Sequence, residues 1–354
     1  MKIHNLRKRI DGIDTRIVHL LNERAKVSQV IGQEKSKMKR MIYSPERERE
    51  VLQKIKSLNK GPMPLEACEA IYREIMSCSL SLERIKDVAY LGREGSFTQS
   101  AALKKFGSQV NYQPCDSIQE VFQKVEREDC DYGVVPIENS TEGAVTHTLD
   151  LFADSDLKIY SQILFHISHN LMSKVRMDKI KKVYSNAQVF GQCRNWLNEH
   201  LPPRLVGQIA VASTTEAAHR AAQEKYAAAI ASGLAAKVYN VPILKRNIQD
   251  IAHNTTRFLV IATQDVSAPT GNDRTSILFS IKDKVGALHA MLTPFYRNKI
   301  NLTKIESRPS KRKAWDYYFF VDFVGHRLDK NVKRALNQLE DMCKYLKILG
   351  SYPV

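Results

Sequence analysis

The spacing of hydrophobic positions changes near residue 88 and again near residue 274, which divides the chain into three segments. Over residues 5–38, apolar side chains recur at three- and four-residue steps, which predicts one long amphipathic helix. A second helix should follow Ser44-Pro45, since serine caps helices and proline suits the first helical position, and a third should span about 64–84. A helix as long as the first one needs partners, either other helices or a second chain.

After Val88, short β-rich runs alternate with helical stretches, which indicates an α/β segment. The expected strands are Val88–Leu91, Tyr132–Ile137, Lys158–Ile167, Lys182–Tyr184, Ala227–Ile230 and Arg257–Ile261. The last segment predicts a ferredoxin-like βαββαβ unit with strand 275–281, helix 286–298, strands 300–307 and 315–324, helix 329–345 and strand 346–350. We therefore expect an all-α domain (1–87), an α/β domain (88–264), a linker (265–274) and an α+β domain (275–354).

The net charge of +16 is divided as +7 over residues 1–88, zero over 89–273 and +9 over 274–354. Nucleic-acid binding would require a recognisable fold motif with interleaved aromatic residues, and neither basic segment contains one, so small anionic ligands explain the charge better. No apolar run approaches the roughly 18 residues of a membrane span, and the charged N-terminus lacks the apolar core of a signal peptide. Six scattered cysteines without a CxxC pair predict a reduced cytoplasmic protein with no disulfide, metal site or cofactor.

Basic residues on the first helix form a candidate anion site. Arg24 and Lys35 are 11 residues apart and share one helix face. Arg7 lies 17 residues before Arg24, about 26 Å along the axis, so one small ligand cannot bind both on the same helix. If all three bind one ligand, an arginine must come from a second subunit. Taken singly, each also suits a solvated helix face.

The order Leu-Arg-Lys-Arg-Ile-Asp-Gly-Ile-Asp (6–14), Leu-Leu-Asn-Glu-Arg (20–24), Lys35 and Tyr-Ser-Pro-Glu-Arg-Glu (43–48) resembles the all-helical chorismate mutases. The resemblance implies a helical dimer that rearranges chorismate to prephenate. It implies that the partner's copy of Arg7 enters the site, that Arg24 holds a carboxylate, that Lys35 donates to the ether oxygen, and that Glu48 takes the ring hydroxyl. It also places Ser44, Ser79 and Glu83 at the substrate; many relatives have Asp in place of Ser44 and Gln in place of Glu83. Such a reaction needs no nucleophile, only a folded dianion and stabilisation of the developing charge.

Three stretches of the middle segment place polar groups beside predicted strands: Gly92–Thr98, Val135–Gly143 and Asn254–Phe258. The first alone is as consistent with a structural turn as with an anion site. Together with Tyr184–Gln188, Gln192-Cys193 and Ser213–Thr215, they resemble the prephenate dehydratases, which convert prephenate to phenylpyruvate. The resemblance implies that Thr256 assists departure of the ring hydroxyl and that the following residues position the substrate: Ser96, Asn139, Ser140, Ser185, Gln192, Arg257 and Phe258. The Thr256 hydroxyl needs a polarising hydrogen bond whose donor the sequence does not identify.

Two motifs of the last segment, Lys284–His289 and Ile305–Pro309, resemble the ACT regulatory domain of phenylalanine-controlled enzymes. The resemblance implies that phenylalanine binds at a dimer interface between Gly286-Ala287-Leu288 and Glu306-Ser307-Arg308, and that binding inhibits the enzyme.

The three resemblances, in this order, imply a bifunctional chorismate mutase/prephenate dehydratase acting as a homodimer or higher oligomer, with no nucleic-acid or membrane partner. The alternative is a non-catalytic amino-acid-sensing protein, which would bind phenylalanine without turning over chorismate or prephenate. A basic nucleic-acid binder would instead show steep salt dependence of binding.

Overall fold

The structure is a computed structural model that describes residues 3–38, 43–83, 87–265, 268–281, 285–309 and 317–354. Expected positions Lys284 and 315–316 lie outside these ranges. The chain separates into two compact units, one of Met1–Asp87 with Lys105–Asn111 and the other of Val88–Lys104 with Tyr112–Val354. The first unit therefore includes a short stretch from beyond its three helices.

Three helices build the first unit, as predicted: α1 (Ile3–Lys37), α2 (Pro45–Leu58) and α3 (Leu65–Leu82). The helix α2 begins where the sequence indicates, because the Ser44 hydroxyl accepts a hydrogen bond from the Arg47 backbone N–H at 3.2 Å. The helix α3 packs against α1. Much of the apolar stripe of α1 nevertheless stays exposed, including Ile10, Ile13, Ile17, Leu20, Val27 and Val30.

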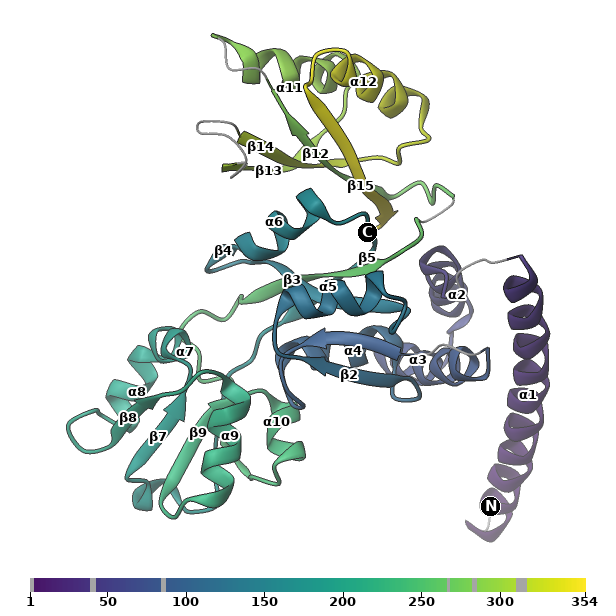
Figure 1. Ribbon diagram of the computed structural model, residues 1–354. Helices are drawn as coiled ribbons and strands as arrows, with labels where there is room; N and C mark the ends of the chain where they lie inside the picture. Colours follow the sequence, from purple (N-terminus) through teal and green to yellow (C-terminus); the bar gives the residue numbers. More distant parts are fainter. Residues whose placement is uncertain (1–2, 39–42, 84–86, 266–267, 282–284, 310–316) are drawn as a thin grey trace. The chain divides into compact units, whose positions relative to one another are not determined.

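The first sheet of the second unit has the strand order β2-β1-β3-β11-β5, with β4 beside β3. Its strands are β1 (Asp87–Leu91), β2 (Asn111–Cys115), β3 (Tyr132–Asn139), β4 (Gly143–Ala144), β5 (Lys158–His166) and β11 (Thr255–Ala262). The strands β1 and β3 are parallel, whereas β11 runs antiparallel to both β3 and β5. The helices along this part are α4 (Phe97–Phe106), α5 (Ile118–Glu126) and α6 (Thr146–Asp154) (Figure 1).

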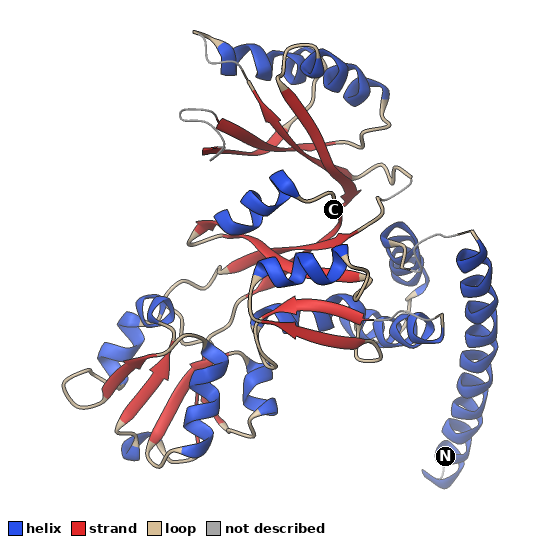
Figure 2. Ribbon diagram, viewed as in Figure 1, coloured by secondary structure: helices blue, strands red, loops and turns tan. Residues whose placement is uncertain are grey.

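A second sheet, ordered β10-β6-β9-β7-β8, has helices on both faces (Figure 2). Its strands are β6 (Asn170–Ser173), β7 (Lys182–Ser185), β8 (Gly207–Ala210), β9 (Ala227–Ala231) and β10 (Ile243–Lys245); its helices are η1 (Met177–Lys179), α7 (Ala187–Gln192), α8 (Arg194–His200), α9 (Thr214–Gln223) and α10 (Gly233–Val238). Successive side chains of a strand point to opposite faces. Accordingly, Ala228 and Ile230 of β9 pack with α7 and α8, while Ala227, Ala229 and Ala231 pack with α9 and α10.

The last part of the chain is the expected βαββαβ unit, with an antiparallel sheet ordered β13-β14-β12-β15. It consists of β12 (Asp273–Ser280), α11 (Ala287–Arg297), β13 (Leu302–Pro309), β14 (Tyr317–Val324), α12 (Lys330–Glu340) and β15 (Tyr345–Pro353). Both helices lie on one face of the sheet (Figure 1). Their apolar side chains pack there around Phe279 and Phe323. The predicted end of α12 at 345 was too late, because the helix closes at Asp341 and the chain turns before β15.

The predicted fold classes are confirmed in all three segments. Within the described ranges, no helix combines the length and the apolar character needed to cross a bilayer. The same residues contain no cluster of three or more His, Cys, Asp or Glu side chains able to bind a metal ion. The six cysteines, all of them described, form no disulfide.

Candidate active sites

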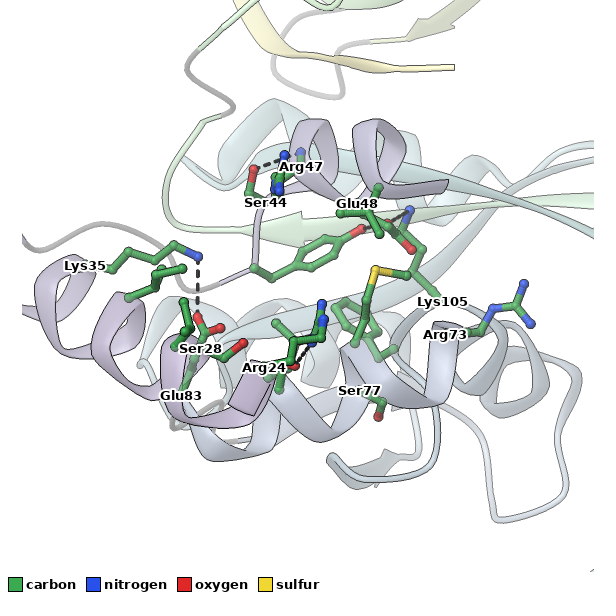
Figure 3. A pocket seen from close by; sticks show the side chains of 18 residues that line it. Arg24, Ser28, Lys35, Ser44, Arg47, Glu48, Arg73, Ser77, Glu83 and Lys105 are labelled. Atoms are coloured by element: carbon green, nitrogen blue, oxygen red, sulfur yellow. Dashed lines mark hydrogen bonds and ion pairs between the residues drawn. The ribbon is translucent and has the colours of Figure 1, made fainter. Parts of the chain in front are cut away.

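A cavity of about 260 Å³ in the first unit gathers six of the seven residues expected in the mutase site (Figure 3). They come from α1, from the start of α2 and from α3, and they are Arg24, Lys35, Ser44, Glu48, Ser79 and Glu83. Arg7 is not among the lining residues; it lies exposed on α1, 17 residues before Arg24. The helical spacing thus separates Arg7 from the cavity of its own chain, as the sequence predicts.

Two contacts fix the cationic side of this cavity to α3. The Arg24 guanidinium donates a hydrogen bond to the Ser79 hydroxyl, which in turn donates to the Ile75 carbonyl at 3.0 Å. The Lys35 ammonium lies 3.4 Å from a carboxylate oxygen of Glu83. The basic lining residues outnumber the two carboxylates of Glu48 and Glu83; they are Arg24, Lys35, Arg47, Arg73 and Lys105. This excess of positive charge suits a dianionic ligand.

The Glu83 side chain is only 8% exposed, and burial raises its pKa above the usual range although Lys35 and Arg24 act in the opposite direction. The effect of burial on the pKa of Glu83 therefore exceeds the opposite effect of the two cations, which the sequence could not decide. A close approach to Gly32 of α1 contributes to this burial, because a Cβ atom added at Gly32 would lie 2.9 Å from the Glu83 Cβ.

Ser44 has two roles in the structure, since it lines the cavity and caps α2. Its hydroxyl also donates to the Glu46 carboxylate at 2.7 Å. Three basic lining residues were not among the residues predicted for this site: Arg47, Arg73 and Lys105. Arg47 directly precedes Glu48, which is a usable signal, but no local pattern marks Arg73 or Lys105.

A second cavity of about 610 Å³ lies in the other unit, beside β3 and β11, and contains Asn139, Gln192, Thr256 and Phe258 of the predicted dehydratase residues. Thr256 and Asn139 are register partners on the antiparallel strands. The Asn139 amide donates to the Thr256 Oγ1 at 2.7 Å, which identifies the polarising donor that the sequence could not. The amide carbonyl of Asn139 accepts from the Thr141 N–H at 2.9 Å, so the amide is oriented with its NH₂ group toward Thr256.

His169 also lines this cavity, although the sequence analysis did not predict it as a site residue. It is 2% exposed, and its Nε2 lies 2.7 Å from the Gln192 side-chain oxygen. Burial lowers the pKa of His169, against the opposing hydrogen bond with Gln192, so the ring is neutral at neutral pH. Gln192 donates from its other end to the Glu142 carboxylate at 2.8 Å, which orients its amide.

The hydroxyls of three predicted substrate-binding serines have structural partners, and none of the three is among the described residues that line the cavity. The Ser96 hydroxyl accepts from the Gln99 N–H at 3.1 Å near the start of α4. The Ser140 hydroxyl accepts from the Thr255 N–H at 2.9 Å, and the buried Ser185 hydroxyl donates to the Ile230 carbonyl at 2.9 Å.

Arg257 differs most from the expectation that it positions the substrate. Side chains alternate along β11, so Thr256 and Phe258 face the cavity and Arg257 faces the opposite side of the sheet. Its guanidinium donates to Gln162 at 2.9 Å, to Asp322 at 2.6 Å and to the Tyr352 hydroxyl at 2.7 Å. In this structure Arg257 does not line the cavity but links the first sheet to the βαββαβ unit.

The two motifs expected to bind phenylalanine lie at the start of α11 and on the edge strand β13. Gly286 caps α11 with a φ of 76°, a left-handed conformation that favours glycine, and Ala287 and Leu288 begin the helix. Glu306, Ser307 and Arg308 lie in the second half of β13. Arg308 makes a two-point ion pair with Asp150 of α6, at 3.2 and 3.3 Å.

Comparison with known proteins assigns each of the three segments to a family. Residues 6–84 match the family model "Chorismate mutase type II", residues 88–266 match "Prephenate dehydratase" and residues 275–341 match "ACT domain". The fold and the two cavities thus define a two-site enzyme of aromatic metabolism with an ACT domain.

The similarity to curated relatives extends over nearly the whole chain. A bifunctional chorismate mutase/prephenate dehydratase of Aquifex aeolicus is 51% identical over 99% of this chain and 98% of its own length, and one of Pseudomonas aeruginosa is 45% identical over 98% and 96%. A solved prephenate dehydratase from Arthrobacter aurescens in complex with L-Phe is 31% identical, with a TM-score of 0.71 over 76% of this chain and 90% of that one.

The chain therefore belongs to the bifunctional chorismate mutase/prephenate dehydratase family. It rearranges chorismate to prephenate and converts prephenate to phenylpyruvate. The alternative of a non-catalytic amino-acid sensor is excluded by this result.

Proposed function

We propose that chorismate is rearranged in the cavity between α1, α2 and α3, and that prephenate is consumed in the cavity beside β3 and β11. The observation that carries this assignment is convergence: Arg24, Glu48 and Glu83 come from three helices and line one small, positively charged cavity. The test is to feed purified enzyme chorismate or prephenate separately. Arg24→Ala should abolish chorismate consumption while phenylpyruvate still forms from added prephenate; loss of both rates would contradict separate sites.

In the mutase cavity the reaction needs substrate folding and charge stabilisation. Arg24 holds a carboxylate of the dianion, and Lys35 donates to the ether oxygen that gains negative charge. Glu83 is the second donor in its neutral form, which its burial favours. A charged Glu83 would repel the same oxygen, so the raised pKa is part of the mechanism.

In the dehydratase cavity Thr256 is the proton donor. The ring carboxylate leaves as CO₂, and the electron pair of its breaking bond to the ring moves into the ring and expels the ring hydroxyl, which takes the Thr256 proton and leaves as water. The Asn139 amide donates to the Thr256 oxygen and stabilises the negative charge that develops there. His169 and Glu142 hold Gln192 at the opposite end of the network.

We further propose that the enzyme works as a homodimer in which the partner supplies Arg7. The exposed apolar stripe of α1 supports this, because contiguous apolar surface of this kind marks an interface. Mixing Arg7→Ala and Arg24→Ala chains tests it. Each heterodimer would contain one intact mutase site, so an exchanged equimolar mixture should recover about a quarter of the wild-type rate. No recovery after confirmed exchange would contradict the shared site.

We also propose that phenylalanine inhibits the enzyme by feedback through the ACT domain. We further propose that the enzyme works in the cytoplasm. The ACT match and the L-Phe complex of the Arthrobacter relative support the ligand, and the absence of disulfides among the six cysteines supports a reducing compartment. An allosteric coupling of about 1–3 kcal/mol would suffice for control. The test is the dehydratase rate at rising phenylalanine for the wild type and Gly286→Ala. Equal inhibition of the two would place the sensor elsewhere.

A further inference from the structure

The mutase cavity contains two residues that its family match does not include. The chorismate mutase model covers residues 6–84, yet Lys105 and Phe106 line the cavity. Both belong to the end of α4, inside the prephenate dehydratase match, and both fall in the first compact unit. A stretch of dehydratase sequence therefore completes a wall of the mutase cavity.

Lys105 contacts the carboxylate that is expected to take the ring hydroxyl of chorismate (Figure 3). Its ammonium lies 2.7 Å from the Glu48 Oε2, and the two side chains are 18% and 14% exposed. The Tyr43 hydroxyl donates to the same oxygen at 2.5 Å. Both contacts use Oε2, so they fix the position of this oxygen, and neither involves Oε1. Two donors on one oxygen are an arrangement that orients a carboxylate.

The position of Lys105 is determined by anchors on α3. Gly107 has a φ of 76°, and a Cβ atom there would lie 2.4 Å from the Ser77 Cβ, so only glycine permits this approach. The Ser108 hydroxyl donates to the Glu74 carboxylate at 2.6 Å, and the Gln109 N–H donates to the Ser77 hydroxyl at 3.0 Å.

Aromatic packing adds a further anchor at the residue directly after Lys105. The Phe106 ring meets the Tyr43 ring edge-on, with centroids 5.1 Å apart, and both side chains are buried. The Lys105 ammonium lies 5.6 Å from the centroid of the same Tyr43 ring. The residues that follow Lys105 are therefore held by several contacts, which place the Lys105 ammonium at Glu48.

We propose that Lys105 is a positioning residue of the mutase site, which orients Glu48 toward the ring hydroxyl of chorismate and adds a positive charge for the dianion. This inference rests on the proposed location of the mutase site. It makes mutase turnover depend on a residue of the dehydratase sequence, whereas dehydratase turnover does not depend on Lys105.

The experiment compares full-length variants on both substrates. Lys105→Met should lower mutase kcat/KM by roughly tenfold, an ordinary cost for losing one charge-assisted contact, and Lys105→Arg should restore most of it. Lys104→Met is the matched control: Lys104 is the neighbouring lysine on α4, and its ammonium donates to the Leu164 carbonyl at 3.1 Å instead. It should leave mutase kcat/KM unchanged. The rate with added prephenate reports folding of every variant.

A double-mutant cycle separates positioning from general support of the fold. If Lys105 acts through Glu48, Lys105→Met should cost little in a Glu48→Gln background, because coupled residues are not additive. Wild-type mutase kinetics for Lys105→Met, or full additivity with Glu48→Gln, would overturn the proposal. If Arg24→Ala left mutase turnover intact, the proposed site itself would fail, which is a different outcome.

Discussion

Arg257 and Asp322 form a buried ion pair, with 2.6 Å between Nη1 and Oδ2, that joins the strand carrying Thr256 to the central part of the βαββαβ sheet. The two side chains are 9% and 11% exposed. Tyr352 completes the cluster, since its hydroxyl accepts from Arg257 and burial raises its pKa to about 12, which keeps it protonated. Thr256 and Arg257 are adjacent in the chain but face the substrate cavity and the ACT domain respectively.

Breaking this pair should destabilise the second unit. Asp322→Asn removes the buried counter-ion of Arg257 and leaves only the more exposed Glu138 carboxylate, 3.8 Å from Nη1, which costs roughly 3 kcal/mol of unfolding free energy. The urea midpoint of the unfolding transition measures it. Asp178→Asn, which removes the exposed pair between Arg176 and Asp178 of the same unit, is the control and should cost less than about 1 kcal/mol. Equal small shifts for the two variants would show that the buried pair contributes little.

Thr256→Ala should abolish most phenylpyruvate formation from prephenate and spare the mutase. Loss of the donating hydroxyl should lower kcat by about 10²–10⁴-fold, the usual range for general acid catalysis. Thr256→Ser keeps a hydroxyl within reach of Asn139 and should retain much more activity. Steady-state rates on both substrates test this, and a comparable loss of the two activities would contradict it.

The mutase should lose activity as pH rises because the neutral, proton-donating form of Glu83 is deprotonated. Burial raises the pKa of Glu83 above its usual value of about 4.3, so the decline should begin at a higher pH than for an exposed glutamate. Glu83→Gln keeps an N–H donor at every pH and should flatten the decline of kcat/KM. The dehydratase profile of the two proteins should be identical. A wild-type mutase profile with no alkaline decline would show that Glu83 is not the donor.

Gly32→Ala should damage the mutase although alanine is the better helix former. The added methyl would lie 2.9 Å from the Cβ of Glu83 and 3.0 Å from its Cα, so Glu83 must move. A shift of a catalytic group by about 1 Å costs on the order of 10²-fold in rate. Gly12→Ala, on the same helix, meets nothing within 4 Å and should keep normal mutase kinetics while stabilising α1 by about 1 kcal/mol. Similar mutase kinetics for the two variants would count against the contact.

Much of the fold could be predicted because local patterns determine it. The helical period and the Ser44-Pro45 cap located α1 and α2, and alternation located the long strands. Five short strands were not predicted: β2, β4, β6, β8 and β10. In segments of two to five residues, the alternation of apolar and polar side chains is often too short to be recognised. Period-two alternation does place Thr256 and Arg257 on opposite faces, but the sequence cannot say which face holds the cavity.

Site residues that are far apart in the sequence and meet only in the folded protein could not be predicted from the sequence. Lys105 enters the mutase cavity only because Gly107 lets the chain approach Ser77, and that approach exists only in the folded state. His169 has no motif of its own and is recognised by its burial beside Gln192. The pKa of Glu83 is likewise raised by burial, to which the close packing of Gly32 contributes and which the sequence does not show.

The close approach at Gly107 limits how this enzyme can be divided. The boundary between the two family matches, at residues 84–88, suggests a natural place to cut the gene into two independent catalysts. A fragment ending there would lack Phe106, which covers Tyr43, and would lose the ammonium that faces Glu48. In the single chain, the dehydratase sequence thus supplies a side chain to the mutase cavity. A separate mutase fragment would therefore need residues 105–111 attached to it.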